Sequence, residues 1–213
     1  MTAREEVLGR IRRALGASPD QVHPAPSGDA AAPGYRTRST AGIADLVSLL
    51  TNRLSDYGSS VRRCTAAQLA SAIAAALAGR GITRAVVAPD FDPSLLPIGV
   101  ECVPDHDFTA QELDAFDAVI TTATVAIAET GTIILDGSAG QGRRALSLVP
   151  DYHLCIVLEG QVVSLVPEAL ARLAPQRPLT WISGPSATSD IELDRVEGVH
   201  GPRRMDVIVV SEP

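Results

Sequence analysis

The amino-acid sequence predicts an α/β protein with an open, largely parallel sheet flanked by helices. Two observations lead to this prediction. Segments with hydrophobic residues at helical spacing alternate along the chain with short apolar runs, which is the pattern of a parallel sheet connected by helices. In addition, every residue from Leu154 to Leu158 is apolar, as is typical of a central strand that is buried on both faces.

The N-terminal part is predicted to differ from the rest. Residues 2–15 carry hydrophobic residues at helical spacing, whereas residues 17–38 are rich in Ala, Pro, Gly and Ser without a hydrophobic period. We therefore predict an N-terminal helix and flexible arm over residues 1–38 and a single α/β domain over residues 39–213. The apolar stripe of a short helix needs burial, either on its own domain or on a second subunit, so a homo-oligomer held through this helix is one expectation.

The other elements follow from hydrophobic period and from capping and turn residues. Helices are predicted over residues 42–56, 66–78, 109–116 and 166–173. Strands are predicted over residues 61–63, 84–88, 100–103, 118–122, 145–149, 153–158, 179–182 and 206–210. Two apolar runs on either side of Glu129-Thr130-Gly131 indicate a hairpin-like reversal. A last helix is predicted to begin at Ile191 and to include Val196.

Composition excludes several classes of function. The chain has 213 residues, a formal net charge of -7 and only 3% aromatic residues, which argues against a nucleic-acid partner. No apolar run approaches the roughly 20 residues of a membrane span. The N-terminus is charged and lacks the apolar core of a signal peptide, so we expect a cytoplasmic protein.

Residue usage also limits the chemistry. All 18 basic residues are arginine, so this chain has no lysine for a P-loop, a Schiff base or a pyridoxal-phosphate site. No G-x-G-x-x-G motif follows a predicted strand. The three cysteines are far apart and form no C-x-x-C pair, which is typical of buried thiols rather than of zinc or iron–sulfur ligands. Asp151 and His153 precede a predicted core strand without enough further ligands for a metal, and we predict no metal site.

One candidate site follows the strand that ends at Ile182. The chain breaks at Gly184-Pro185, and the hydroxyl and carboxyl groups that follow are those of Ser186, Thr188, Ser189 and Asp190. A strand, a glycine- and hydroxyl-rich turn and a helix N-terminus together form an anion-binding geometry, because backbone N–H groups converge there. An ordinary capped connection is the alternative, and the acidic residues in the turn disfavour a phosphate.

Two further groups of residues are candidates for contact with a substrate. Glu129 lies beside Gly131 at a tip between buried strands, where it either meets a substrate as a base or nucleophile or serves as a plain turn residue. His200 lies in a glycine-rich turn with Arg203 three residues later, so the pair could accept a hydroxyl proton and clamp a carboxylate. A turn histidine satisfied by backbone is the alternative. We expect the Glu129 turn and the Ser186 loop to meet over the carboxyl edge of the sheet.

A glycine loop offers another possible cradle. Residues 136–144 contain three glycines and end in Arg143 and Arg144, so the loop either binds an anion through its backbone N–H groups or is a plain surface loop.

Three segments together resemble the lactate utilization protein C family, whose members contain a LUD domain. They are Ala128-Glu129-Thr130-Gly131-Thr132, Leu148-Val149-Pro150-Asp151-Tyr152-His153, and the run from Trp181 to Glu192 continued by Gly198 to Arg203. The resemblance implies a fold similar to the sugar-phosphate isomerase and CoA-transferase group. It also implies a role in oxidising L-lactate to pyruvate together with two separately encoded iron–sulfur proteins, with no cofactor in this chain.

The resemblance leaves three hypotheses for the chemistry. The first is a non-catalytic or accessory subunit of an L-lactate-oxidising complex. The second is a stand-alone enzyme for acyl or CoA esters, because the Glu129 turn is similar to the Ser-Glu-x-Gly turn of CoA-transferases with Ala128 in place of Ser. The third is a module that binds a small carboxylate. The expected catalytic residues are Glu129 and His200, and the expected ligand-binding residues are Thr130, Gly131, Thr132, Gly184, Ser186, Thr188, Ser189, Asp190 and Arg203.

Overall fold

A computed structural model describes residues 3–14, 36–188, 196–197 and 200–211. The chain divides into two compact units, Met1–Arg36 and Thr37–Pro213. The first unit contains helix α1 (Ala3–Ala14), on which Val7 and Leu8 are exposed. Most of the predicted arm over residues 17–38 lies outside the described residues.

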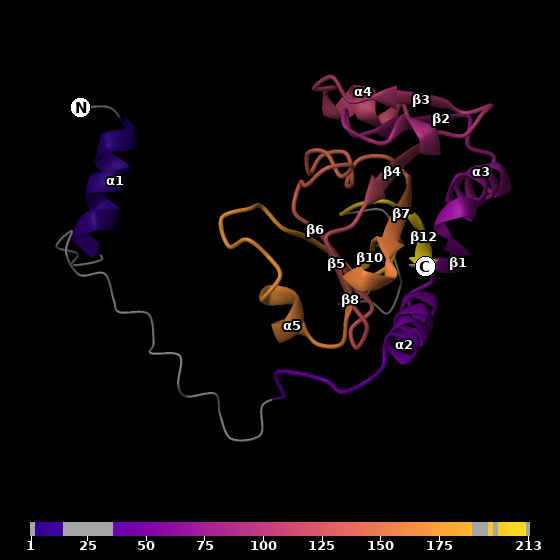
Figure 1. Ribbon diagram of the computed structural model, residues 1–213. Helices are drawn as coiled ribbons and strands as arrows, with labels where there is room; N and C mark the ends of the chain where they lie inside the picture. Colours follow the sequence, from indigo (N-terminus) through magenta and orange to yellow (C-terminus); the bar gives the residue numbers. More distant parts are fainter. Residues whose placement is uncertain (1–2, 15–35, 189–195, 198–199, 212–213) are drawn as a thin grey trace. The chain divides into compact units, whose positions relative to one another are not determined.

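The second unit is built on a six-stranded sheet in which every pairing is parallel (Figure 1). The strand order is β1-β12-β7-β4-β2-β3, so the two longest strands, β7 and β12, are interior. The bounds are β1 (Ser60–Thr65), β2 (Arg84–Val87), β3 (Glu101–Pro104), β4 (Ala118–Thr122), β7 (Tyr152–Leu158) and β12 (Arg204–Ser211). The predicted α/β class, with a largely parallel sheet flanked by helices, is confirmed.

Helices cover both faces of this sheet because its strands are apolar on both sides. Helix α3 (Leu69–Gly79) packs Ile73 and Leu77 against Leu154 of β7 on one face. Helix α2 (Ile43–Asp56) packs Leu50 against Val207 of β12 on the opposite face. The remaining helices are α4 (Ala110–Asp114) and α5 (Val166–Leu170), and single 3-10 turns are η1 (Ala66–Gln68), η2 (Pro93–Leu95) and η3 (Glu159–Gln161).

A second sheet shares the α2 side of the parallel sheet. Its order is β8-β5-β6-β9, with β8 (Val162–Val163), β5 (Val125–Ile127), β6 (Thr132–Leu135) and β9 (Thr180–Ile182). Strands β5 and β6 pair antiparallel, which confirms the predicted reversal around Glu129. Ala126 and Ile133 pack in the core shared with α2, whereas Val125 and Ile134 pack in the core under α5. The β5–β6 pair is therefore buried on both faces.

Two predicted elements are wrong. Residues 145–149 form turns rather than a strand, with hydrogen bonds from Leu146 N to Arg143 O and from Val149 N to Ala145 O. Leu146 is nevertheless fully buried. A short apolar run indicates that a segment is buried, but it does not determine the backbone conformation of that segment. Val196, expected in a helix, lies in β11 (Val196–Glu197), which pairs antiparallel with β10 (Ala187–Thr188). The predicted helix start at Ile191 lies outside the described residues.

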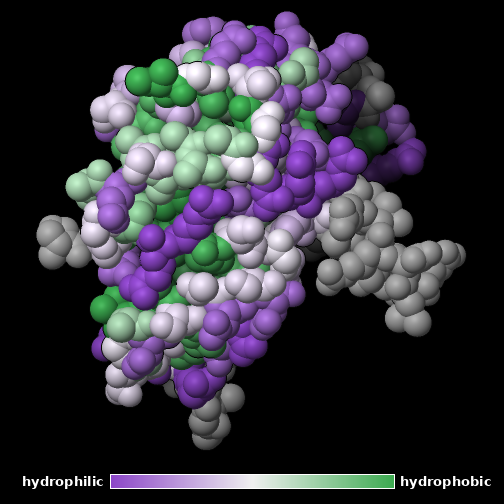
Figure 2. All heavy atoms as spheres, turned by 90° about the vertical axis from the view of Figure 1, so that its right-hand side faces the viewer, coloured by the Kyte–Doolittle hydropathy of each residue, from purple (hydrophilic) through white to green (hydrophobic). Residues whose placement is uncertain are grey.

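The surface mixes hydrophilic and hydrophobic side chains. Figure 2 shows hydrophilic side chains across the middle of the face that carries α2 and α3, with hydrophobic side chains above and below them. Exposed large hydrophobic residues of the second unit lie on separate elements and include Ile43, Ile98, Leu158, Leu170 and Trp181. Within the described ranges, no helix combines the length and apolar character needed to cross a membrane.

Candidate functional site

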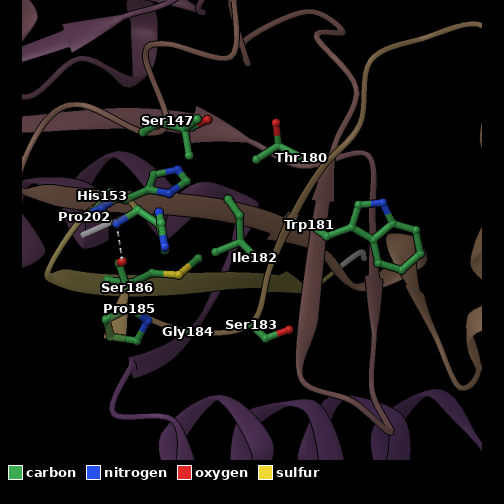
Figure 3. A pocket seen from close by; sticks show the side chains of 14 residues that line it. Ser147, His153, Thr180, Trp181, Ile182, Ser183, Gly184, Pro185, Ser186 and Pro202 are labelled. Atoms are coloured by element: carbon green, nitrogen blue, oxygen red, sulfur yellow. Dashed lines mark hydrogen bonds between the residues drawn. The ribbon is translucent and has the colours of Figure 1, made fainter. Parts of the chain in front are cut away.

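A cavity of about 250 Å³ lies at the amino ends of β7 and β12. His153 and Met205, each the second residue of its strand, form part of its lining. The rest comes mainly from the loop Ser183–Ser186 after β9 and from the turn His200–Pro202 before β12 (Figure 3). The predicted location of the pocket, over the carboxyl edge of the sheet, is wrong for this cavity.

The described residues that line the cavity carry no acidic or guanidinium group. Their polar side-chain groups are two imidazoles and a set of hydroxyls. Figure 3 shows Ser147 and Thr180 on the same side of the cavity as His153, and Ser183 and Ser186 on the opposite side. A mainly apolar cavity with a few converging polar groups is typical of small-molecule sites.

The His153 ring is the most deeply buried polar group of this cavity, with 1% of the residue exposed. Its Nε2 lies 2.7 Å from Oγ1 of Thr121 on β4. Burial lowers the pKa of His153 to about 4, because a desolvated imidazolium is disfavoured. The ring is therefore neutral at pH 7 and has one N–H donor and one acceptor nitrogen.

The two predicted bends do meet, although on the α2 side of the molecule. Gly131 has φ +61°, and a Cβ there would lie 2.6 Å from Cβ of Arg53. Gly184 has φ +82°, and a Cβ there would lie 2.5 Å from Cβ of Tyr57. Glycine is required at both positions because the end of α2 touches the backbone of each bend. The bends are also joined directly, since Oγ1 of Thr132 lies 2.8 Å from Oγ of Ser183.

The structure brings only some of the predicted site residues to the cavity. Gly184, Ser186 and His200 line it, and the backbone N of His200 donates to Oγ of Ser186 over 3.1 Å. Thr188 belongs to β10. Ser189 and Asp190 lie outside the described residues.

The residues of the β5–β6 turn are not among the lining of the cavity. The backbone N of Glu129 donates to Ser164 O over 3.1 Å. Oγ1 of Thr130 lies 2.7 Å from Oγ1 of Thr132, so the hydroxyls of this turn form a chain that ends at Ser183. The Glu129 turn thus contacts the loop Ser183–Ser186 through Ser183 without lining the cavity itself.

Arg203 is engaged with a carboxylate of the protein itself. Its Nε donates to Oδ1 of Asp151, and Arg204 donates to the other carboxylate oxygen over 3.2 Å. Although partial burial would by itself raise the pKa of Asp151, the Arg203 hydrogen bond and charge lower it below its usual value. A role for Arg203 as a carboxylate clamp would require exchange of this partner.

The glycine loop of residues 136–144 is closed by its own contacts. Oε1 of Gln141 accepts from the backbone N of Asp136 and of Gly137 over 2.8 and 3.1 Å, and Asp90 accepts from Gly140 N over 3.0 Å. Because these N–H groups are already satisfied within the protein, the loop fits the surface-loop alternative better than the anion cradle.

Arg143 is held at the end of this loop. It forms two hydrogen bonds to the carboxylate of Asp105, at 2.6 and 3.0 Å. The Arg143 hydrogen bonds lower the pKa of Asp105 below its usual value. Arg143 is therefore a structural residue. Of the two arginines at the end of this loop, Arg144 remains the candidate counter-charge for an anion.

Sequence reasoning missed His153, Thr121, Ser147 and Thr180 as site residues. For His153 a signal was available, because a single polar residue stands at the start of an otherwise apolar run that continues to Leu158. Thr121, Ser147 and Thr180 carry no such signal. They come from a strand, a turn and another sheet, and only tertiary pairing places them near His153.

Burial of His153 makes stability sensitive to acid. Its pKa is about 4 in the folded protein against an ordinary value of 6.5. Between these values the unfolded chain binds a proton that the folded chain does not, so the free energy of unfolding falls as the pH is lowered through this window. We expect a loss of about 2 kcal/mol between pH 7 and pH 5 from this group, measured by urea unfolding at both values.

Two variants separate this effect from general acid sensitivity. His153→Gln should lose about 2 kcal/mol less than the wild type between the same pH values. His106→Gln, in which the replaced ring is exposed, should match the wild type. An equal loss in the wild type and in His153→Gln would show that the buried ring is not the source.

Comparisons with known proteins confirm the resemblance to the lactate utilization protein C family. The family model described as LUD domain matches residues 51–210. A protein of Deinococcus radiodurans named lactate utilization protein C is 47% identical over 215 residues, covering 98% of this chain and 96% of that protein. One of the same name from Geobacillus thermodenitrificans is 28% identical, covering 96% and 92%.

A solved structure shows the same fold. The crystal structure of a DUF162 family protein from Deinococcus radiodurans is similar with a TM-score of 0.70 and 41% sequence identity, covering 80% of this chain and 99% of that one. The family model and the nearly full-length relative at 47% identity agree. This chain therefore belongs to the LUD domain family, together with the lactate utilization protein C sequences.

Proposed function

We propose that this chain acts in lactate utilization, as a subunit of a system that oxidises L-lactate to pyruvate together with two iron–sulfur proteins. The observation that carries the proposal is the 47% identity to lactate utilization protein C of Deinococcus radiodurans over 98% of the chain. Similarity that extends over both proteins in full supports a shared role more strongly than a shared fold does.

The placement of the cysteines supports a redox centre in a partner protein. Cys64, Cys155 and Cys102 lie on β1, β7 and β3, which are separated by one strand and by two strands in the sheet order. At a strand spacing of about 4.8 Å, these backbones lie about 10 and 14 Å apart. An iron–sulfur cluster needs its cysteines around one small site, so these three cannot share one.

The state of the thiols points the same way. Burial raises the pKa of Cys155 to about 12 and raises the pKa of Cys64 and of Cys102 above the ordinary thiol value. Raised pKa values of this kind are typical of thiols packed in apolar surroundings rather than of activated thiolates. Electrons from lactate would thus pass to clusters outside this chain.

The size of the cavity favours a small acid over a CoA ester. Its volume of about 250 Å³ is below the roughly 300–1,000 Å³ of pockets for drug-sized ligands, whereas L-lactate has only six heavy atoms. Glu129, the nucleophile that the CoA-ester alternative requires, is not among the residues that line this cavity. We therefore place the proposed ligand, a small carboxylate, between the Ser183–Ser186 loop and His153.

The proposal is tested by reconstitution. The full chain and the two iron–sulfur proteins of the proposed system are purified separately, mixed, and assayed for co-elution and for reduction of an artificial electron acceptor by L-lactate. We expect co-elution and a rate that falls to background when this chain is left out, with D-lactate as a stereochemical control. Equal rates with and without this chain, or three proteins that elute separately, would refute the proposal.

The CoA-ester alternative has its own test. Glu129→Gln should leave lactate oxidation in the mixture within about twofold, because Glu129 is not part of the cavity lining. Turnover of an acyl-CoA by the chain alone, abolished by the same substitution, would favour the alternative instead.

A further inference from the structure

We propose that His153 recognises the hydroxyl group of a small 2-hydroxy acid in this cavity, with Nδ1 of its ring as the acceptor. The identity of the acid rests on the proposed function, whereas the choice of residue rests on the cavity itself. L-Lactate carries a hydroxyl donor at its second carbon, and pyruvate has a carbonyl oxygen there. The site should consequently bind L-lactate more tightly than pyruvate.

A chain of hydrogen bonds behind His153 sets its tautomer. The chain ends at the backbone carbonyl of Thr122, which can only accept. Sγ of Cys155 lies 4.0 Å from that carbonyl and donates to it, and Oγ1 of Thr121 lies 3.7 Å from the same sulfur and donates to it. The Thr121 oxygen is then left to accept from Nε2–H of His153 over 2.7 Å.

All three side chains of this relay project from the same face of the sheet. Thr121 pairs with Cys155 in the register of β4 and β7, and His153 precedes Cys155 by two residues, so the three lie on one side of the pleat. With its proton on Nε2, a neutral ring carries a lone pair on Nδ1. Thr121 is thus a positioning residue, and Nδ1 is the group that meets the ligand.

Nδ1 faces the cavity, and none of the residues that the structure describes is its hydrogen-bond partner. Among the residues that the structure describes, the one hydrogen bond of the His153 ring is that of Nε2. In the described ranges, the side-chain polar atoms that lack both a partner and access to solvent are Oγ of Ser59 and Oη of Tyr152. Nδ1 of His153 also lacks a partner in these ranges but is not one of these atoms. It must therefore be accessible, and the space that it faces is the cavity that His153 lines. Figure 3 shows the ring at the cavity wall. A buried acceptor without a partner is costly, and a ligand hydroxyl would satisfy it.

Arg144 provides the counter-charge for the carboxylate of the acid. It lines a smaller cavity of about 150 Å³ that shares Ser147 and Thr180 with the main cavity, so the two adjoin. Its side chain is exposed, and within the described part of the chain no ion pair involves it. Guanidinium groups bind carboxylates well because they offer paired donors.

Calorimetric titration of the full chain with L-lactate and with pyruvate tests the assignment of His153. For the wild type we expect L-lactate to bind about tenfold more tightly, which corresponds to one hydrogen bond. His153→Gln keeps an amide near Thr121 but has no acceptor at the position of Nδ1, so it should lose this preference while pyruvate binding changes little. His153→Asn places an amide oxygen near that position and should retain part of the preference.

An Arg144 variant tests recognition of the carboxylate group independently of recognition of the hydroxyl group. Arg144→Gln should weaken both acids by the same factor of about ten, because both carry a carboxylate, and it should leave their ratio unchanged. Arg204→Gln is the matched control, since Arg204 is similarly exposed and pairs with Asp151; it should leave both affinities unchanged. A change in the lactate-to-pyruvate ratio in Arg144→Gln would overturn its assignment.

The tautomer is tested by ¹⁵N chemical shifts of labelled His153, which should show the proton on Nε2 in the wild type and a mixture of tautomers in Thr121→Val.

Four outcomes would overturn the inference. They are equal binding of the two acids by the wild type, binding of neither acid, a proton on Nδ1, and an unchanged preference in a folded His153→Gln. If the reconstituted system oxidises lactate but this chain binds neither acid, the inference fails and the proposed function stands. If the chain prefers L-lactate but the reconstituted system oxidises lactate without the chain, the proposed function fails and the inference about His153 stands.

Discussion

Replacing Gly184 with alanine is expected to lower the free energy of unfolding by about 3 kcal/mol, the sum of a left-handed backbone and of overpacking. Gly184 has φ +82°, and the new Cβ would lie 2.5 Å from Cβ of Tyr57 and 3.3 Å from its backbone oxygen. Neither neighbouring atom is the free end of a flexible side chain, so helix α2 or the loop has to move. Urea unfolding at pH 7 measures the loss, and weaker ligand binding should accompany it because Gly184 lines the cavity.

A second glycine with a positive φ distinguishes the cost of the backbone conformation from the cost of the close contact with α2. Gly99 has φ +93°, and a Cβ there would meet no atom within 4 Å, so Gly99→Ala carries the backbone cost of about 1 kcal/mol alone. Gly131→Ala should resemble Gly184→Ala, because its Cβ would lie 2.6 Å from Cβ of Arg53. If Gly184→Ala and Gly99→Ala lose the same free energy, close contact with α2 does not fix the bend.

The second large effect is expected for Arg80→Met, which should destabilise the protein by about 3 kcal/mol. Arg80 donates to Oδ1 of Asp206 over 2.7 Å, and the Asp206 side chain is only 3% exposed. The guanidinium also lies 5.7 Å from the centre of the Tyr152 ring. Removing the cation leaves a buried carboxylate without its counter-charge at the start of β12, next to the strand that carries His153. Chemical denaturation at neutral pH measures the loss.

A double substitution shows whether the isolated carboxylate causes this loss. Arg80→Met combined with Asp206→Asn should be more stable than Arg80→Met alone, because the unpaired charge has been removed. Arg204→Met should cost less than about 1 kcal/mol, since Arg204 and Asp151 are 45% and 33% exposed and Asp151 keeps Arg203. A double variant that is no more stable than Arg80→Met alone would contradict this explanation.

Local signals in the sequence predict most of the architecture. The apolar run to Leu158 indicates an interior strand, and β7 is one. Thr109 is predicted to cap a helix, and its side chain accepts from Glu112 N at the start of α4. The Glu129 reversal also follows from two apolar runs around a glycine. These features depend on neighbours in the sequence, which is why a single sequence suffices for them.

Contacts between distant segments set the limits of that prediction. The run from Ala145 to Val149 has the composition of a strand, yet turn hydrogen bonds close it on itself. Of the site, the sequence singles out Gly184, Ser186 and His200, which share the cavity. It could not reveal that Tyr57 holds Gly184 in place, or that β4 supplies a partner for His153. The amino-edge location likewise depends on the second sheet packing against α2, which no local pattern encodes.

The floor of the cavity belongs to the interior strands β7 and β12, which pair with each other at His153 and Met205, and β7 also pairs there with β4. In native-state hydrogen exchange, the amides of central strands are generally among those that need the highest free energy to open. An acid bound there as proposed would meet a floor built from the central strands of the fold, so little of its binding energy would be consumed in ordering those strands. Selectivity between two acids that differ by a single hydrogen bond depends on such rigidity, because a yielding wall would adjust to either one.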